Sequence, residues 1–208
     1  MRNVLTASDV PLSGELRIPI GTIVTPAAEE LARERGVRII EVKPDELKKA
    51  PCPERTIAIG ADHGGFAMKE ALKPLIAELG LEIRDVGVTD GKTADYPDIA
   101  IQVAELVSQG TAGRGVIVDG AGIGSAMAAN KVPGVRAALC YDKASARNSR
   151  EHNNANVLTL GGRLLTQSQA DEVLRTWLGT AFAGGRHAAR VDKIAEIEKR
   201  FALWKPAN

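Results

Sequence analysis

The chain has 208 residues, of which 44% are hydrophobic and 25% charged, a length that suits one domain with an appendage or two small domains. Its 27 basic and 26 acidic residues leave a net charge of +1, so the overall charge does not suggest a nucleic-acid or anionic-membrane surface. No apolar run approaches the ~20 residues of a membrane span, and the start lacks an apolar core followed by a cleavage pattern, so we expect a cytoplasmic protein.

Residues 1–43 form a first predicted unit. Thr25 and Pro26 are typical of a helix start, because threonine caps a helix and proline fits the first helical position. In order, we expect one or two short strands within Leu16–Val24, a helix over Ala27–Arg35 and a strand over Val37–Val42.

A linker is predicted to follow. The stretch Lys43–Glu54 carries three prolines and three lysines and has little apolar content. We therefore divide the chain into an N-terminal extension (residues 1–43), a linker (44–54) and a main domain (55–208).

In the main domain, apolar strands alternate with helices. The predicted strands are Thr56–Ala61, Glu82–Val86, Gly115–Val118, Val135–Leu139 and Val157–Leu160. The predicted helices are Phe66–Leu79, Tyr96–Ser108, Gly122–Asn130, Lys143–Arg150, Gln167–Leu178 and His187–Ala202. This alternation predicts an α/β fold with a doubly wound, five-stranded parallel sheet. Ligands bind such sheets outside the carboxyl ends of the strands, so the loops there are candidate site loops.

The first strand of the main domain ends in Asp62-His63-Gly64-Gly65. Packing explains a carboxylate and an imidazole at this position poorly, so Asp62 and His63 are candidate functional residues. Turn chemistry explains Gly65 equally well.

The third strand ends in Asp119 and the glycine-rich loop Gly120-Ala121-Gly122-Ile123-Gly124. Alternating glycines before a helix free backbone N–H groups to bind an oxyanion or phosphate, although the sterics of the turn account for glycines equally well. The third glycine comes one residue too early for the dinucleotide-binding pattern GxGxxG. Since proton abstraction next to a carbonyl needs a carboxylate beside an anion hole, Asp119 is a candidate base.

Three arginines near glycines indicate phosphate binding. Arg163 follows two glycines at the end of the fifth strand, whereas Arg186 and Arg190 lie four apart on one face of the last helix. Paired guanidinium groups make a phosphate clamp, and the alternative is a solvated basic face. His152 stands beside Asn153 and two further asparagines, which indicates a polar pocket, although a lone histidine is more often structural.

The cysteines and histidines follow no metal-binding pattern. Cys52 and Cys140 form neither a CxxC pair nor the Cys/His spacing of a zinc site. Neither a metal nor a disulfide framework is expected.

Together these stretches resemble ribose-5-phosphate isomerase B and the related allose-6-phosphate and galactose-6-phosphate isomerases, from about Thr56 to Phe201. The resemblance rests on Gly60–Phe66, Asp95-Tyr96-Pro97, Gly120–Gly124 with Ala128-Ala129-Asn130-Lys131, Arg150–Leu158 and Gly184-Gly185-Arg186-His187. Five motifs in the family's order are far more specific than any one alone. The resemblance implies a flavodoxin-like doubly wound sheet, a homodimer with active sites at the subunit interface, and no metal or organic cofactor.

The resemblance also implies residue roles. His152 is expected to open the sugar ring, with Asp62 close by. The expected phosphate binders are His63, Arg163, Arg186 and Arg190. Tyr96 and Asn153 are expected to line the site, and the backbone of Gly120, Ala121, Gly122 and Gly124 to hold the enediolate oxygens.

Three positions depart from the family pattern. Many members carry a catalytic cysteine at the position of Asp119, and others use a glutamate at the position of Ser125. Ala121 stands where members often have threonine or serine. We therefore hypothesise that Asp119 is the base of an aldose–ketose isomerase that interconverts ribose 5-phosphate and ribulose 5-phosphate through a cis-enediolate. The alternatives are an isomerase of a hexose 6-phosphate (allose or galactose) and a catalytically weakened sugar-phosphate binding or assembly protein.

The N-terminal extension lies outside this resemblance. Its segment Ile18–Ala28 is similar to short segments attached to bacterial microcompartment enzymes. A small packing or oligomerisation unit is the favoured interpretation. The alternative is a targeting unit that contacts a microcompartment shell or cargo protein, which would place the enzyme inside the compartment.

Overall fold

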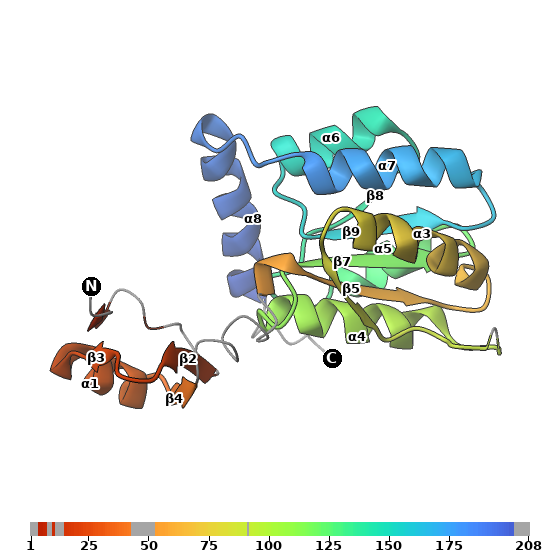
Figure 1. The fold of residues 1–208 in the computed structure, drawn as a ribbon. Coiled ribbons are helices and arrows are strands. Elements are labelled where there is room, and N and C mark those ends of the chain that lie inside the picture. Colours follow the sequence, from red (N-terminus) through yellow and green to blue (C-terminus); the bar gives the residue numbers. More distant parts are fainter. Residues whose placement is uncertain (1–3, 8–9, 11–14, 43–52, 91, 202–208) are drawn as a thin grey trace, which may run out of the picture. The chain divides into compact units, whose positions relative to one another are not determined.

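A computed structural model describes residues 4–7, 10, 15–42, 53–90 and 92–201 (Figure 1). The chain divides into two compact units, Met1–Pro51 and Cys52–Asn208. Most of the predicted linker, residues 44–52, lies outside the described residues, and a 3₁₀ turn, η2 (Pro53–Arg55), leads into the second unit. Within the described ranges, no helix is long and apolar enough to cross a membrane.

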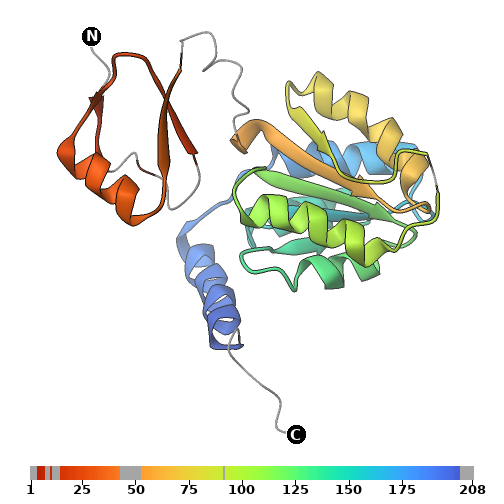
Figure 2. The ribbon, with the colours of Figure 1, turned by 90° about the horizontal axis from the view of Figure 1, so that it is seen from below.

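Among its described residues, the first unit contains two pairs of parallel strands and one helix (Figure 2). Its elements are β1 (Val4–Leu5), β2 (Glu15–Pro19), β3 (Ile23–Val24), α1 (Pro26–Glu34) and β4 (Arg38–Val42). β1 pairs with β3 and β2 with β4. The Thr25 side chain accepts a hydrogen bond from the Ala28 amide, which confirms the predicted helix cap. α1 buries Ala28 and Ala32 in a small core with Leu5, Val10, Ile18 and Val37.

The second unit is an α/β domain with a five-stranded parallel sheet. Its strands are β5 (Thr56–Ala61), β6 (Glu82–Asp85), β7 (Arg114–Asp119), β8 (Ala137–Leu139) and β9 (Val157–Gly161). Its helices are α3 (Phe66–Glu78), α4 (Tyr96–Ser108), α5 (Ile123–Ala129), α6 (Lys143–Glu151), α7 (Gln167–Gly179) and α8 (Ala188–Phe201), with a 3₁₀ turn, η3 (Gly185–His187), before α8. The predicted fold class is confirmed.

Side-chain alternation along the strands builds a core on each face of this sheet. Ile57 and Ile59 of β5 pack with α3, α6 and α7, whereas Ala58, between them, packs with α4 and α5. Figure 1 shows α3, α6 and α7 on one side of the sheet and α4 on the other. The sheet is therefore covered on both faces, as near-continuous apolar strands require.

The strand order is β6-β5-β7-β9-β8, with all neighbours parallel. Relative to the flavodoxin order 2-1-3-4-5, the last two strands exchange places, so β9 lies between β7 and β8. After β5 the chain goes to one side for β6 and then returns to the other side for β7. The carboxyl ends of β5 and β7 thus flank the switch point, where such sheets bind ligands.

The last helix, α8, differs from the others because none of its described side chains is buried. In Figure 2 it leads away from the layers of sheet and helices. Ile194, Ile197 and Phe201 of α8 remain exposed despite their size. α8 thus carries large apolar side chains that stay exposed in a single chain.

Candidate functional site

The loops after β5, β7 and β9 meet at the carboxyl edge of the sheet. Asp62 is buried, and its Oδ1 accepts a hydrogen bond of 2.9 Å from the Gly65 amide. The Gly162 amide donates to the Asp119 carbonyl (2.7 Å), and the Arg163 amide donates to the Gly120 carbonyl (3.1 Å). Backbone hydrogen bonds therefore join the loops after β7 and β9, which are far apart in sequence, beside the switch point.

Asp119 is the centre of the glycine-rich loop. Its Oδ1 accepts hydrogen bonds from the amides of Ala121 (2.7 Å) and Gly122, and its Oδ2 accepts from the amide (3.0 Å) and the hydroxyl of Ser125. Asp119 and Ser125 are both buried. Since a carboxylate offers about four acceptor positions, these four donors occupy its whole capacity. Two of the amides that we expected to hold substrate oxygens thus bind the chain's own carboxylate.

The shape of this loop depends on glycine. Gly122 has a φ of +78°, and a Cβ atom there would lie 2.5 Å from Leu139 Cδ1 and 2.8 Å from the Leu160 carbonyl carbon. A side chain would therefore be strained in backbone and in packing. Gly124 lies against the Tyr96 ring, where a Cβ atom would come within 2.5 Å of the ring.

The remaining C-edge residues are exposed. His63 follows Asp62 at the edge, and the Arg163 side chain lies next to Gly120. Tyr96 begins α4 with an exposed ring. We call this set of predicted residues the C-edge cluster: Asp62, His63, Tyr96, Asp119, Gly120, Ala121, Gly122, Gly124 and Arg163.

The other predicted residues gather around the end of α6. His152 caps this helix, and its ring stacks on the His187 ring with centroids 4.2 Å apart and planes at 6°. The Ala183 amide donates to the Glu151 carbonyl (3.0 Å), which joins the segment before η3 to α6. Burial lowers the pKa of His187, and the charges of His152, Arg186 and Arg190 lower it further, against a smaller opposing effect of Glu151. The N-edge cluster comprises His152, Asn153, Arg186, His187 and Arg190.

A single chain keeps these two clusters apart. α6 and α7 both begin after a strand's carboxyl end and run back along the sheet, so His152 and η3 lie at the amino ends of the strands. The nine residues of α6 and the thirteen of α7 span about 13 and 20 Å. The distance between the clusters is thus on the order of 15 Å. The ring-opening histidine and the base that we hypothesised cannot meet on one copy of the chain.

The sequence analysis did not single out four residues of these clusters' surroundings for roles. Tyr141 donates its hydroxyl hydrogen to the Ala121 carbonyl (3.0 Å), and Ser125 binds Asp119. At the other edge, His187 stacks on His152 and Asn148 contacts its Nδ1. Tyr141 stands in a strand-end loop, His187 within a motif of the family resemblance and Ser125 at the position of the family's glutamate, so these three positions carried a signal. Asn148 was visible only as a polar residue on a helix.

The described residues include no group of three histidine, cysteine, aspartate or glutamate side chains that could hold a metal ion. Cys140 is fully buried behind the carboxyl edge, and burial raises the pKa of its thiol. A thiol of this kind is a poor nucleophile or base, because reactivity requires the thiolate. Cys52 lies outside the described residues.

Comparison with known proteins identifies the family. The family described as Ribose/Galactose Isomerase matches residues 57–194. The chain belongs to this family. Ribose-5-phosphate isomerase B of Escherichia coli is 40% identical over 146 residues, which are 70% of this chain and 98% of the relative. D-erythrulose-4-phosphate isomerase of Pectobacterium atrosepticum is 38% identical over 144 residues, 69% of this chain and 95% of the relative.

A solved structure agrees with this family assignment. Ribose-5-phosphate isomerase B of Clostridium thermocellum superimposes with a TM-score of 0.69 at 46% identity and covers 70% of this chain and 99% of its own. The chain is thus a sugar-phosphate isomerase of the ribose/galactose isomerase family. The family match begins at residue 57, so the N-terminal extension lies outside it.

Proposed function

We propose that the chain interconverts ribose 5-phosphate and ribulose 5-phosphate. The observation that carries this proposal is the family match over residues 57–194 of the main domain, together with ribose-5-phosphate isomerases B among the similar proteins. In the proposed reaction, His152 assists ring opening and Asp119 removes the C2 proton of the open aldose. The cis-enediolate is then protonated at C1 to give the ketose. Asp62 supports ring opening, and His63, Arg163, Arg186 and Arg190 bind the phosphate, whose binding energy orients the reacting carbons.

The proposed base needs one of its four hydrogen bonds to open. The amides of Ala121, Gly122 and Ser125 are fixed by the loop, but the Ser125 hydroxyl can rotate about a single bond. In this proposal the hydroxyl turns away when substrate binds, and Oδ2 of Asp119 then accepts the proton. The amides of Gly120 and Gly124 face the enediolate oxygens, and Tyr96 and Asn153 line the site.

A homodimer would bring the two clusters together. In this proposal, the C-edge cluster of one copy faces the N-edge cluster of the other, so that Asp119 and His152 of one site come from different copies. Symmetric dimers about a twofold axis are the commonest oligomers, and the same contact then forms two sites. The separation of the clusters within one chain supports this arrangement.

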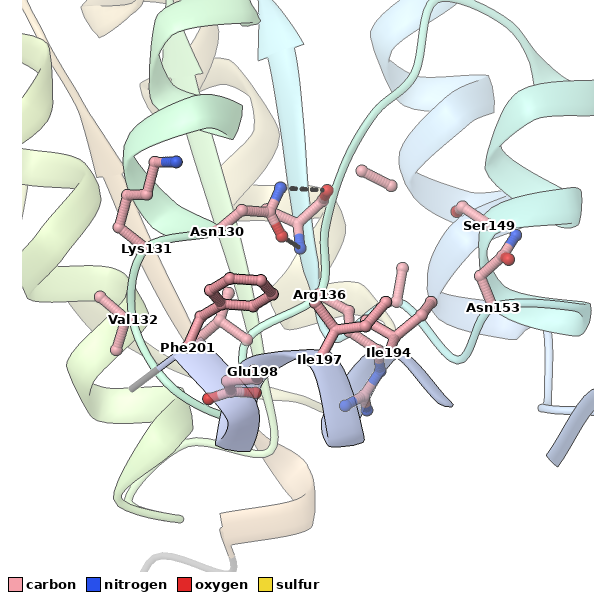
Figure 3. Close-up of a pocket in the computed structure, with 14 residues that line it drawn as sticks. Asn130, Lys131, Val132, Arg136, Ser149, Asn153, Ile194, Ile197, Glu198 and Phe201 are labelled. Atoms are coloured by element: carbon pink, nitrogen blue, oxygen red, sulfur yellow. Dashed lines mark hydrogen bonds between the residues drawn. The ribbon is translucent and has the colours of Figure 1, made fainter. Parts of the chain in front are cut away.

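An apolar cavity supports the same arrangement. A cavity of about 630 Å³ lies between α8 and the segment from α5 to β8 (Figure 3). Val132, Ile194, Ile197 and Phe201 give it an apolar wall, and Asn153 of the N-edge cluster also lines it. Met127 on the neighbouring helix α5 is 64% exposed. An exposed apolar surface next to proposed site residues is typical of a subunit interface.

For the N-terminal extension we propose a packing or oligomerisation role in a cytoplasmic enzyme. It has a core of its own, formed by Leu5, Ile18, Ala28 and their neighbours. The alternative, a contact with a microcompartment shell or cargo protein, predicts that fusion of residues 1–51 to a fluorescent protein would direct it into compartments. Diffuse fluorescence in a compartment-forming host would favour the packing role.

The reaction is tested with a panel of aldose phosphates assayed for ketose formation. We expect the highest kcat/KM for ribose 5-phosphate. The panel includes allose 6-phosphate, galactose 6-phosphate and D-erythrose 4-phosphate. The last is the aldose isomer of D-erythrulose 4-phosphate, after which a 38% identical isomerase is named. A higher kcat/KM for one of these would replace ribose 5-phosphate as the proposed substrate.

Asp119→Asn is the control variant in the same assay. Because general-base catalysis contributes about 10²–10⁴-fold, turnover should fall by at least that order. The asparagine oxygen still accepts from the Ala121 and Gly122 amides, but its NH₂ group faces the Ser125 amide, so circular dichroism is used to check the fold. Unchanged turnover would remove Asp119 as the base. Binding of ribose 5-phosphate by the wild-type chain without hydrogen exchange at C2 would instead favour the weakened binding or assembly protein.

A further inference from the structure

Rotation and protonation of the His152 ring are set by neighbours that the proposed reaction leaves without a role. His152 caps α6, and its side chain is 38% exposed. Two contacts hold the ring: the Asn148 side chain, one helical turn earlier, and the His187 ring from η3. Together they decide which ring nitrogen carries the proton.

A chain of amides fixes the direction of the first contact. Asn153 Nδ2 lies 3.5 Å from the Asn148 carbonyl oxygen and 3.4 Å from Asn148 Oδ1. A backbone carbonyl can only accept a hydrogen bond, so the Asn153 amide must turn its NH₂ group toward Asn148. Asn148 Oδ1 is then the acceptor, and Asn148 Nδ2 is left to face His152 Nδ1 at 3.0 Å. Because Nδ2 only donates, Nδ1 must carry a lone pair.

The second contact is the stack of the His152 ring on the His187 ring. His187 is buried, and its Nε2 faces Arg186 Nε at 3.5 Å, where the guanidinium donates and the imidazole accepts. The charged groups around the stack are Glu151 on α6, Arg186 on η3 and Arg190 on α8. A cation on His187 would lie near two arginines, so the uncharged form of this ring is the one that packs on His152.

We propose that Asn148 and His187 are positioning residues that hold His152 in the tautomer with its proton on Nε2. Glu151 Oε1 lies 3.8 Å from this nitrogen, beyond hydrogen-bond length, and leaves the N–H available for substrate. In ring opening, the bond between C1 and the ring oxygen breaks, and the C1 hydroxyl proton ends on that oxygen. The Nε2–H donor stabilises the charge that builds on the oxygen, and the histidine leaves the step unchanged. The proposal rests on the proposed function.

The tautomer can be measured without any activity. The chain has three histidines, so ring nitrogen-15 signals of a histidine-labelled protein at about pH 8, where histidines are neutral, can be assigned with His63→Gln and His187→Phe. We expect a protonated Nε2 on His152 in the wild-type chain and a protonated Nδ1 in Asn148→Asp, because a carboxylate only accepts. Arg147→Gln, an exposed change on the same helix, should keep the wild-type signals. A protonated Nδ1 in the wild-type chain, or no change in Asn148→Asp, would overturn the proposal.

Kinetics then separate ring opening from proton transfer. Ribose 5-phosphate closes into a ring, whereas ribulose 5-phosphate cannot, because its C5 oxygen carries the phosphate. Fixing a histidine in the wrong tautomer costs serine proteases about 10⁴-fold in turnover. We expect Asn148→Asp to slow turnover of ribose 5-phosphate by at least about tenfold. It should leave deuterium exchange at C1 of ribulose 5-phosphate unchanged.

His187→Phe, which keeps a flat ring in the stack, should lose less turnover than His187→Ala. Equal losses in ring turnover and in exchange would overturn the ring-opening role. A wild-type chain without turnover or exchange on any phosphate would overturn the proposed function and this role with it, while the nitrogen signals would still decide the tautomer.

Discussion

At the scale of single residues, the carboxylate of Asp119 has two roles. In the structure it closes the glycine-rich loop through three amides and one hydroxyl. In the proposed reaction it also accepts a proton. The Ser125 hydroxyl links the two tasks, since it is the donor that can leave without moving the backbone. Substitution of Ser125 therefore tests whether Asp119 takes the substrate proton directly or through the serine hydroxyl.

We predict that Ser125→Ala retains or raises turnover of ribose 5-phosphate. The change removes one hydrogen bond and frees an acceptor position on Oδ2 of Asp119, so the carboxylate becomes more available. The measurement is steady-state kcat, with circular dichroism to check the fold. A hundredfold loss with an intact fold, on the scale of about 10²–10⁴ for proton-transfer catalysis, would instead assign the proton transfer to the hydroxyl itself.

Cys140 provides a second residue-scale prediction. Its buried thiol has a raised pKa and lies near the carboxyl edge of the sheet. The family resemblance implies a catalytic cysteine at this edge in many members, but at the position of Asp119. In a Cys52→Ser background, we expect the native chain to react with iodoacetamide far more slowly than the unfolded chain. Cys140→Ser should keep its isomerase activity. Rapid labelling that abolishes activity would show that a thiolate takes part.

At the scale of elements, a buried ion pair fixes the start of the loop that leads to Tyr96. Lys69 on α3 is fully buried, and its Nζ donates to both carboxylate oxygens of Asp85 (2.9 and 2.8 Å) and to the Val88 carbonyl (2.8 Å). Lys73 adds a second ammonium group at 3.0 Å from Asp85. Removing Asp85 would leave a buried cation without its main partner.

We predict that Asp85→Ala lowers the free energy of unfolding by about 2–3 kcal/mol. This is at or below the usual loss when one member of a buried ion pair is removed, because Lys69 keeps Val88 and Glu70 as partners. Urea titration measures the loss. The double variant Lys69→Met/Asp85→Asn should be more stable than Asp85→Ala. The exposed pair Glu78–Arg175 provides the control, since Glu78→Ala should cause no measurable change. Equal stability of Asp85→Ala and wild type would contradict this account.

The same pair predicts a pH dependence. Burial alone would raise the pKa of Asp85, but the hydrogen bonds from Lys69 and Lys73 outweigh it and lower the pKa. The unfolded chain therefore takes up this proton first as the pH falls. The stabilisation is present above about pH 4, the ordinary range of an aspartate, and is lost as the pH falls further. Asp85→Asn should lack this component of acid unfolding.

Sequence periodicity predicted most elements of the main domain, because most of its strands are buried apolar runs and most of its helices have an apolar face. Thr56–Ala61 and Tyr96–Ser108 were predicted with their observed bounds. The strand β1, with two residues, is too short to show a pattern. The exchange of β8 and β9 was also not predictable, since order depends on which faces pack and not on the strands' own residues.

The types and sequence positions of the candidate residues were predictable, but their division between the two edges of the sheet was not. Strand-end loops identified Asp62 and Asp119. His152 and His187 are 35 positions apart, and their stacking follows only from where α6 and α7 end. The binding of Asp119 to Ser125 likewise requires the loop conformation, which a positive φ at Gly122 makes possible. Tertiary geometry, not composition, divides the residues between two edges.

At the scale of the whole molecule, the division between the edges predicts complementation between inactive chains. Asp119→Asn damages the C-edge cluster and His152→Asn the N-edge cluster. In a mixed dimer one site carries both changes and the other carries neither. Half of randomly paired dimers are mixed and each has one intact site of two, so refolding equal amounts together should restore about a quarter of wild-type activity. No recovery, with mixed dimers present by native mass spectrometry, would contradict a shared site.

The opposite placement of the two clusters also bears on how much enzyme a cell must make. If the sites are shared in this way, a monomer carries only two incomplete sites and is inactive. The activity per chain then depends on the fraction of chains that are in dimers. Halving expression near the dissociation constant would then reduce flux by more than half. Selection would act on the strength of the contact around α8 as strongly as on the residues that touch the sugar.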